Sequence, residues 1–400
     1  MKKPKIRFKG FTETWEQRKL EDFGVATGGT SIESEFIEDG KYKVISIGSY
    51  SECSKYVDQG IRTEKTPKTK NRILNKNDLA MILNDKTSSG KIIGRVLLID
   101  ADDAYVYNQR TERIEVNHNC YVSEFLYHLL NADNIRAKII RTAQGNTQIY
   151  VNWNVIKNFT YDIPINICEQ IVIGDCFSKL DDLITLHQRK CENLKKLKKF
   201  MLQKMFPQNG ENVPKIRFYN FTDTWEQRKL GSICKITMGQ SPNGSTYSET
   251  PCDYILVQGN ADLKDGWVVP RIWTSQITKT AKSGDLIMSV RAPAGAIGKT
   301  AYDVVIGRGV ASINGNEFIY QTLKKYEIEG YWRKIATGST FKSINSEDIN
   351  DTILFVPIDD SEQKQIGSLF SKLDNLITLH QSKCDNLKEL KKYMLQNMFI

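Results

Sequence analysis

Residues 177–206 read FSKLDDLITLHQRKCENLKKLKKFMLQKMF, and residues 370–399 read FSKLDNLITLHQSKCDNLKELKKYMLQNMF, with 24 of 30 positions identical. In each copy, apolar side chains recur at alternating steps of three and four residues, the heptad pattern of a helix that pairs with another helix. The predicted contact positions are Phe177, Leu180, Ile184, His187, Cys191, Leu194 and Met201 in the first copy and Phe370, Leu373, Ile377, His380, Cys384, Leu387 and Met394 in the second.

Each copy needs a helical partner, and the other copy is available in the same chain. Isologous packing of two equivalent helices about a pseudo-two-fold axis makes them antiparallel. A helix of roughly 35 residues at ~1.5 Å rise per residue spans about 50 Å. We therefore expect an antiparallel intramolecular coiled coil that separates two globular blocks.

A second repeat precedes the divergent part of each half. PKIRFKGFTETWEQRKL (4–20) matches PKIRFYNFTDTWEQRKL (214–230) at 14 of 17 positions, so the chain is a tandem duplication. By contrast, residues 21–166 and 231–359 share only scattered landmarks. The simplest reason is that the repeated parts face identical partners and the divergent parts face different ones. The alternative is an ordinary duplication whose loops drifted.

Length and composition limit the function classes. A chain of 400 residues predicts two or three domains, because single cores stop growing near ~250–300 residues. No run approaches the ~18 apolar residues of a membrane span, so we expect a cytoplasmic protein. The eight cysteines form no CxxC pair, and we expect neither a metal site nor a disulfide framework.

The net charge of +9 permits a polyanionic partner. However, residues 21–166 carry 18 basic against 19 acidic side chains, and residues 231–359 carry 13 of each. Any contact with nucleic acid in these two blocks must therefore come from local clusters of charge.

The two divergent blocks have strand-like runs followed by helical patches, which predicts an α+β fold with mixed sheets. Neither block has a complete catalytic motif. The GKT at 298–300 lacks the upstream glycine of a phosphate-binding loop, where Pro293 stands instead, and no Pro-Pro pair occurs. The sequence therefore predicts no catalytic residues.

Basic and amide side chains instead gather in loop-like stretches. Arginine and lysine can contact phosphates, arginine suits guanine, and asparagine or glutamine suits adenine. Taken singly, such residues are more often solvated. The grouped candidates for DNA binding are Arg62, Lys65, Lys68, Lys70, Arg72, Asn108, Gln109, Arg110, Asn146 and Gln148 in the first block and Gln258, Asn260, Arg291, Lys299, Arg308, Ser339 and Lys342 in the second.

This organisation resembles the DNA-specificity subunits of type I restriction-modification enzymes. The resemblance is carried by the repeated PKIRF…TWEQRKL segment, the run GDLIMSVRAPAGAIGKTA (284–301), the ending GST…VPI (338–358) and the duplicated FSKLDxLITLHQ helix, and it covers essentially the whole chain. The order of these motifs, with the two flanking repeats, is specific. The resemblance divides the chain into six segments. These are a lead-in (1–20), a first target-recognition domain (21–166), a central helix (167–206), a linker with the second lead-in (207–230), a second target-recognition domain (231–359) and a C-terminal helix (360–400).

The resemblance implies that each divergent block reads one half of a split double-stranded DNA site, and that the repeated helices space the halves and dock two methyltransferase subunits. Adenine methylation and ATP-dependent cleavage would be activities of the assembled complex. The cleavage would be carried out by its restriction subunits. S-adenosylmethionine, ATP and Mg²⁺ would be bound by the other subunits. One departure is that Asn84 stands where the second block has Arg291, so equivalent loops need not contact equivalent bases.

Two other classes of function stay open at this point. A self-contained DNA-modifying enzyme would transfer a methyl group by itself, against which the missing motifs speak. For a coiled-coil scaffold that binds only proteins, exchanging residues 21–166 for those of a relative would leave DNA sequence preference untouched.

Overall fold

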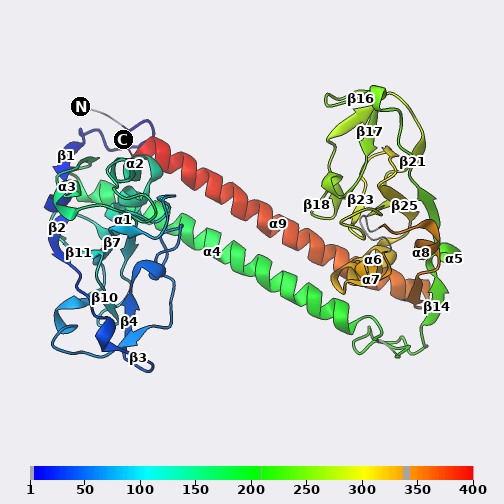
Figure 1. The fold of residues 1–400 in the computed structure, drawn as a ribbon, viewed down its shortest axis with the longest axis horizontal. Coiled ribbons are helices and arrows are strands. Elements are labelled where there is room, and N and C mark those ends of the chain that lie inside the picture. The colour runs from blue at the N-terminus through cyan, green and yellow to red at the C-terminus, as the bar shows by residue number, and fades with distance from the viewer. Residues whose placement is uncertain (1–3, 209, 337–342, 400) are drawn as a thin grey trace. The chain divides into compact units, whose positions relative to one another are not determined.

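The computed structural model describes residues 4–208, 210–336 and 343–399 (Figure 1). The chain divides into two compact units. Unit 1 comprises residues 1–188 and 382–400, and unit 2 comprises residues 189–381. Each unit thus contains one globular block, part of the long helix α4 (Ile167–Lys204) and part of the long helix α9 (Asp360–Met398).

The globular block of unit 1 contains two main sheets. The antiparallel one has the order β2 (Gly24–Gly28), β11 (Thr111–Val116), β7 (Leu79–Ile82), β9 (Val96–Leu98). The mixed one has the order β3 (Phe36–Ile37), β5 (Arg62–Thr63), β4 (Tyr42–Ile45), β10 (Tyr105–Tyr107), β6 (Ile73–Leu74), with β4 and β10 parallel. Two short ribbons pair β1 (Glu16–Lys19) with β13 (Thr160–Ile163) and β8 (Asn84–Asp85) with β12 (Ile149–Tyr150).

Unit 2 has a closely similar arrangement. One mixed sheet has the order β15 (Lys235–Met238), β25 (Val310–Asn314), β22 (Leu286–Ser289), β23 (Ile297–Lys299), β19 (Trp267–Val268), β18 (Leu263–Lys264). The other has the order β16 (Tyr247–Ser248), β20 (Ile272–Thr274), β17 (Tyr254–Val257), β24 (Val304–Ile306), β21 (Lys279–Ala281). The ribbon β14 (Glu226–Lys229) with β26 (Ile353–Val356) corresponds to β1 with β13.

Short helices complete the blocks. Unit 1 has α1 (Ser123–Asn131), α2 (Asp133–Arg141) and α3 (Trp153–Ile156), and unit 2 has α5 (Leu230–Ile233), α6 (Glu317–Ile328), α7 (Tyr331–Ile335) and α8 (Ser346–Asn350). The 3₁₀ turns are η1 (Leu20–Phe23), η2 (Glu33–Glu35), η3 (Ile47–Ser49), η4 (Lys70–Arg72), η5 (Gly244–Thr246) and η6 (Asn260–Asp262).

Strand β7 shows why a central strand of a sheet can be apolar at every position of its sequence. Its four residues are all buried, because Leu79 and Met81 pack with α1 while Ala80 and Ile82 face the mixed sheet. Successive side chains of a strand point to opposite faces, so a strand covered on both faces is apolar at every position. In unit 2, Leu286 and Ile287 of β22 divide in the same way.

The long helices begin at equivalent capping residues. The Oδ1 atom of Asn166 accepts a hydrogen bond from Cys168 N at 2.9 Å, and Oδ1 of Asp359 accepts one from Ser361 N at 2.7 Å. These side chains satisfy amide groups that have no partner within the helix.

Within each unit, the segments of α4 and α9 run antiparallel. In unit 1 the rings of Phe177 and Phe399 stack with centroids 5.5 Å apart, and in unit 2 Phe206 and Phe370 lie 5.9 Å apart. The fourteen predicted contact positions are all buried or half-buried. The predicted α+β class, with mixed sheets and a tandem duplication, is confirmed.

The repeated lead-ins fasten each block to a long helix. Arg7 forms two bonds of 2.7 Å with the buried carboxylate of Glu169 at the beginning of α4, and Arg217 binds Glu362 of α9 at 2.7 and 2.8 Å. Paired parallel N–H···O bonds of this kind are strong and directional. Trp15 and Trp225 are both buried.

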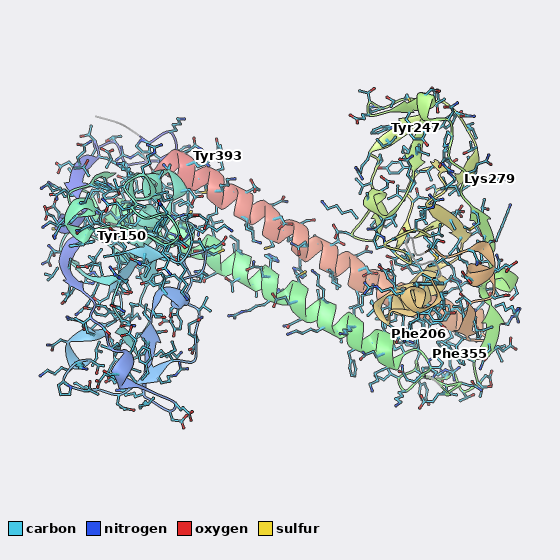
Figure 2. All side chains as sticks on the ribbon, in the orientation of Figure 1. Tyr150, Phe206, Tyr247, Lys279, Phe355 and Tyr393 are labelled. Carbon is cyan, nitrogen blue, oxygen red and sulfur yellow. The ribbon has the colours of Figure 1, made fainter. Side chains whose placement is uncertain are left out.

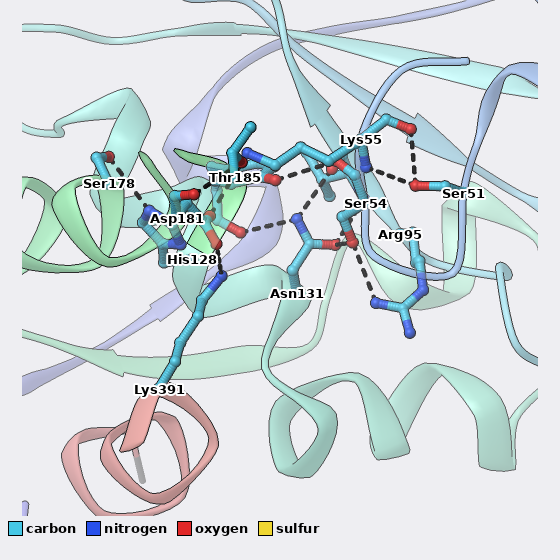
Figure 3. A network of polar contacts seen from close by, with 12 residues as sticks. Ser51, Ser54, Lys55, Arg95, His128, Asn131, Ser178, Asp181, Thr185 and Lys391 are labelled. Carbon is cyan, nitrogen blue, oxygen red and sulfur yellow. Dashed lines mark hydrogen bonds and ion pairs between the residues drawn. The ribbon is translucent and has the colours of Figure 1, made fainter. Parts of the chain in front are cut away.

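A polar network fixes the globular block of unit 1 to both helix segments (Figure 3). Asp181 of α4 binds Lys391 of α9 at 2.6 Å and lies 3.5 Å from Lys55 of the block. His128 shares a hydrogen bond of 3.3 Å with Ser178, and burial lowers its pKa to about 3. His128 is therefore neutral at physiological pH, and it serves packing in this structure.

Candidate nucleic-acid interface

Four loops of unit 1 meet at one end of its antiparallel sheet. Leu83 N donates to Arg110 O at 2.8 Å, and Val151 N donates to Leu83 O at 2.8 Å. Gly29 N donates to Thr111 O, also at 2.8 Å. The first loop cluster, as we call it, consists of residues 29–33, 83–91, 108–110 and 144–150.

Unit 2 repeats this set of backbone bonds. Val290 N donates to Gly309 O at 2.9 Å, Ile344 N to Val290 O at 2.9 Å, and Gly239 N to Val310 O at 3.0 Å. The second loop cluster consists of residues 239–243, 258–260, 290–295, 307–309 and 343. The two clusters therefore share a backbone frame although their sequences differ.

One glycine in each unit permits the close approach of two loops. A Cβ atom on Gly29 would lie 2.0 Å from Asn108 O, and one on Gly239 would lie 2.1 Å from Gly307 O. Such distances exclude any side chain at either position. Gly29 and Gly239 are 210 positions apart, the same offset as the repeated lead-ins, and this signal in the sequence was available but was missed.

The hairpin between β10 and β11 carries Asn108, Gln109 and Arg110. Asn108 is buried, and its amide donates to Glu33 Oε1 at 2.9 Å. Gln109 and Arg110 are exposed, and Arg110 adopts a φ of 67°. The structure thus gives Asn108 an internal bonding role and presents its two neighbours to solvent.

Glu33 was not among the predicted site residues, but it organises this hairpin. Hydrogen bonds from Ser31 and Asn108, with a smaller effect of Gln109, lower the pKa of Glu33 to about 2. Its carboxylate is therefore ionised over the physiological range and acts only as an acceptor. A single acidic residue in an exposed loop has no sequence pattern that separates it from a solvated one.

The loop with Asn146 and Gln148 is a tight hairpin at the same edge. Gln144 and Tyr150 exchange two backbone bonds of 2.9 Å, and Gly145 has a φ of 102°. Both predicted residues are exposed at its tip, and the neighbouring Tyr150 is 43% exposed (Figure 2). Strand pairing of β12 with β8 places this hairpin beside Asn84.

The basic stretch 60–72 is largely matched by acidic or aromatic groups. Arg62 binds Asp58 at 2.8 Å, Lys68 lies 3.4 Å from Glu35, and the Arg72 guanidinium lies over the Tyr107 ring. Lys65 and Lys70 are exposed and have no ion pair within the described part of the chain. These two lysines are the cations of this stretch that remain available to a phosphate backbone.

In the second loop cluster of unit 2, Arg291 and Arg308 are exposed, and Gln258 and Asn260 are half-buried. Lys299 lies at the opposite end of β22, where it binds Glu317 at 2.9 Å and lies over the rings of Trp267 and Tyr320. Ser339 and Lys342 lie outside the described residues.

The long helices also expose apolar side chains at equivalent positions. Leu183 and Leu376 are 43% and 42% exposed, and Leu186 and Leu379 are 46% and 47% exposed. The same holds for Leu197 with Leu390 and for Phe200 with Tyr393. Repeated exposed leucines are typical of a surface that another protein covers.

The described ranges 4–208, 210–336 and 343–399 contain neither a candidate metal site nor a candidate membrane-spanning helix. No group of three or more histidine, cysteine, aspartate or glutamate side chains there could hold a metal ion. No helix in these ranges is long and apolar enough to cross a membrane.

Known proteins similar to this chain match nearly its whole length. A Methanocaldococcus jannaschii protein provisionally named type I restriction enzyme MjaX specificity subunit is 26% identical, in an alignment 413 positions long that covers 96% of this chain and 92% of that protein. The type I restriction enzyme MjaVIII specificity subunit of the same organism is 20% identical, with coverages of 96% and 91%.

Solved structures share the fold. The crystal structure of a type I restriction-modification system S subunit from M. genitalium superimposes with a TM-score of 0.71 at 16% identity and covers 100% of this chain and 99% of its own. A chain from a study of complex assembly and conformational transition of the type I R-M system gives a TM-score of 0.53 at 21% identity, with coverages of 97% and 98%.

The profile of one protein family matches both halves of the chain, over residues 12–196 and 222–389. These two matches correspond to the two copies that the internal repeats define. The chain therefore belongs to the family of the type I restriction modification DNA specificity domain, of which it contains two copies.

Proposed function

We propose that this chain is the non-catalytic DNA-recognition subunit of a type I restriction-modification complex. In this proposal the blocks 21–166 and 231–359 are the target-recognition domains, and each reads one half of a bipartite site. The observation that carries it is the pair of loop clusters, which have the same backbone frame and different polar side chains. A frame of this kind suits two readers of different sequences on one duplex.

The clusters offer the groups that such a role requires. Exposed arginine, glutamine and asparagine side chains stand on loops that the sheet edge holds in place, and they can bond to base edges in the major groove. Lys65, Lys70 and the other exposed cations of the blocks would supply contacts to phosphates, which set position and affinity rather than sequence preference.

The repeated surfaces would bind two copies of a methyltransferase subunit. Equivalent exposed leucines on α4 and α9 offer two equivalent apolar patches, as two identical partners require. Restriction subunits would join through that complex, and methylation of adenine and ATP-dependent cleavage would be carried out by the partners with S-adenosylmethionine, ATP and Mg²⁺.

Mapping adenine methylation in host DNA tests the proposal. The full chain is co-expressed with its methyltransferase subunit, and a chimera carries residues 21–166 of a relative with a different target. We expect one half-site of the methylated sequence to change and the other half-site to stay the same. Methylation should still require the methyltransferase subunit. A matched chimera that exchanges only the helix segment 177–206 should retain the original target.

Two results would contradict the proposal. One is methylation by this chain alone in the absence of the partner, which would make it an enzyme. The other is an unchanged methylation pattern in the 21–166 chimera when the chimera assembles normally, which would favour a scaffold that binds only proteins.

A further inference from the structure

Each loop cluster contains a three-residue connection between two strands, and the middle residue of this connection occupies an equivalent position in the two units. In unit 1 three residues, 108–110, join the inner strand β10 to β11, and in unit 2 three residues, 307–309, join β24 to β25. Asn108 N donates to Ile45 O at 2.9 Å, and Gly307 N donates to Val257 O at 2.8 Å. Gln109 and Arg308 are the middle residues of these two connections.

The last residue of each connection is fixed in the same way. Arg110 O accepts from Leu83 N, and Gly309 O accepts from Val290 N. A backbone bond therefore holds each end of the connection, and the side chain in the middle projects from a rigid frame. Groups held on such a frame are the ones that can discriminate between bases.

Arg308 is exposed, and its backbone N–H donates to Ser241 Oγ at 3.1 Å. Its guanidinium has no ion pair with any carboxylate in the described ranges. An unpaired guanidinium presents two parallel donors, which match the O6 and N7 acceptors of guanine. Loss of one such two-bond contact between a guanidinium and a base weakens binding to the correct base roughly 10- to 100-fold.

Gln109 is held differently. Its Nε2 donates to Glu33 Oε1 at 3.0 Å, and its backbone N–H donates to Asn108 Oδ1 at 2.7 Å. One amide N–H and the amide oxygen remain for a ligand. This combination of one donor and one acceptor matches N7 and N6 of adenine and does not match the two acceptors of guanine.

We infer that Gln109 and Arg308 occupy the same reading position in the two recognition domains, where Gln109 contacts an adenine in one half-site and Arg308 a guanine in the other. Glu33 is the positioning residue that orients the Gln109 amide. This inference rests on the proposed function and adds the class of base at one position of each half-site.

The test uses the full chain assembled with its methyltransferase subunit and a library of random DNA duplexes. Selection of bound duplexes first defines the wild-type target, and the relative affinity for all four bases is then measured at every position. We expect Arg308→Gln and Arg308→Lys to lose preference for one guanine by roughly 10- to 100-fold. Gln109→Ala should lose preference for one adenine in the opposite half-site.

Matched variants separate recognition from general effects. Lys282→Ala removes an exposed cation of unit 2 that is paired with Asp303 away from the loop cluster, and it should leave every base preference unchanged. Glu33→Ala should lose the same adenine preference as Gln109→Ala, and the double variant should lose no more than either. A purely structural role of Glu33 would instead lower affinity equally for all four bases.

Two outcomes would overturn the inference alone while the proposed function stands. These are an unchanged preference at every position in folded Arg308→Gln, and loss of preference in the same half-site for Arg308→Gln and Gln109→Ala. A wild-type complex that selects no bipartite sequence would overturn the proposed function itself and this inference with it.

Discussion

The Nζ atom of Lys391 lies 2.6 Å from Oδ1 of Asp181 in unit 1. In unit 2, Lys198 and Asp374 form the equivalent pair at 2.6 Å. Residues 181 and 374, and residues 198 and 391, are each 193 positions apart, so every partner of one pair is the repeat of a partner in the other. This reciprocity is the signature of isologous pairing between two equivalent helices.

A charged residue at a helix contact position fixes the register of a pair, because any shift leaves it buried without a partner. Lys391→Ala should therefore destabilise unit 1 by roughly 3 kcal/mol, since it removes the 2.6 Å partner of a mostly buried carboxylate. Urea unfolding checks this value. The double variant Lys391→Ala/Asp181→Ala should recover much of the loss, and Lys282→Ala, at an exposed ion pair, should leave the midpoint unchanged.

Protonation of Asp181 should weaken the same contact. Burial acts to raise the pKa of Asp181, but the charge and hydrogen bond of Lys391 and the charge of Lys55 outweigh it, so the pKa lies below its ordinary value of 3.8. A lowered carboxyl pKa contributes stability above the unfolded pKa that is lost as pH falls through the folded pKa. Asp181→Asn should therefore flatten the loss of stability of unit 1 below about pH 4. If the free energy of unfolding of the variant fell as steeply at acid pH as that of the wild type, this assignment would be contradicted.

The two lead-in tryptophans are expected to differ in energy. The indole Nε1 of Trp15 donates to Glu169 Oε1 at 3.3 Å, whereas Nε1 of Trp225 has no hydrogen-bond partner in the part of the chain that the structure describes. Phenylalanine removes the donor and keeps an aromatic ring. Trp15→Phe should cost about 1 kcal/mol more of the free energy of unfolding than Trp225→Phe, which is the value of one buried hydrogen bond. Equal costs in thermal unfolding would show that the Trp15 bond contributes nothing.

Glu112 should make unit 1 less stable as the pH rises. It is 6% exposed, its carboxyl group has no hydrogen-bond partner among the described residues, and burial raises its pKa to about 7 against the opposing charge of Arg72. A raised carboxyl pKa means that the folded state holds a proton that the unfolded state releases near pH 4.5, so stability falls between about pH 4.5 and 7. Glu112→Gln should remove this decline and stabilise the protein at pH 8 by an amount on the order of 3 kcal/mol. Parallel pH–stability curves for the variant and the wild type would refute the expectation.

The exposed leucines of the long helices should govern assembly with the methyltransferase subunit. Leu186→Glu/Leu379→Glu places a charge on both equivalent apolar patches, and we expect roughly tenfold or greater loss of affinity for that subunit because a buried unpaired charge is costly. Lys196→Glu is the matched control, since the second helix already has Glu389 at the equivalent position. Isothermal titration measures the affinity, and circular dichroism confirms that the helices persist. Unchanged affinity in the double variant would place the docking surface elsewhere.

The amino-acid sequence by itself determined the duplication and the two long helices, and it predicted the positions at which those helices make contact. Heptad periodicity is local, because a helix presents residues such as Phe177 and Leu180 on one face wherever it lies, and an internal repeat needs no structure to be seen.

Only the tertiary structure decided which loop residues come together. Gln109 and Arg308 became equivalent through backbone bonds to strands distant in sequence, and Asn108 proved to be buried against Glu33. Lys299 lies at the opposite end of its sheet, with its charge matched by Glu317. Loop residues carry no periodic signal, and their positions depend on strand register and on long-range hydrogen bonds that form only when the sheet is complete.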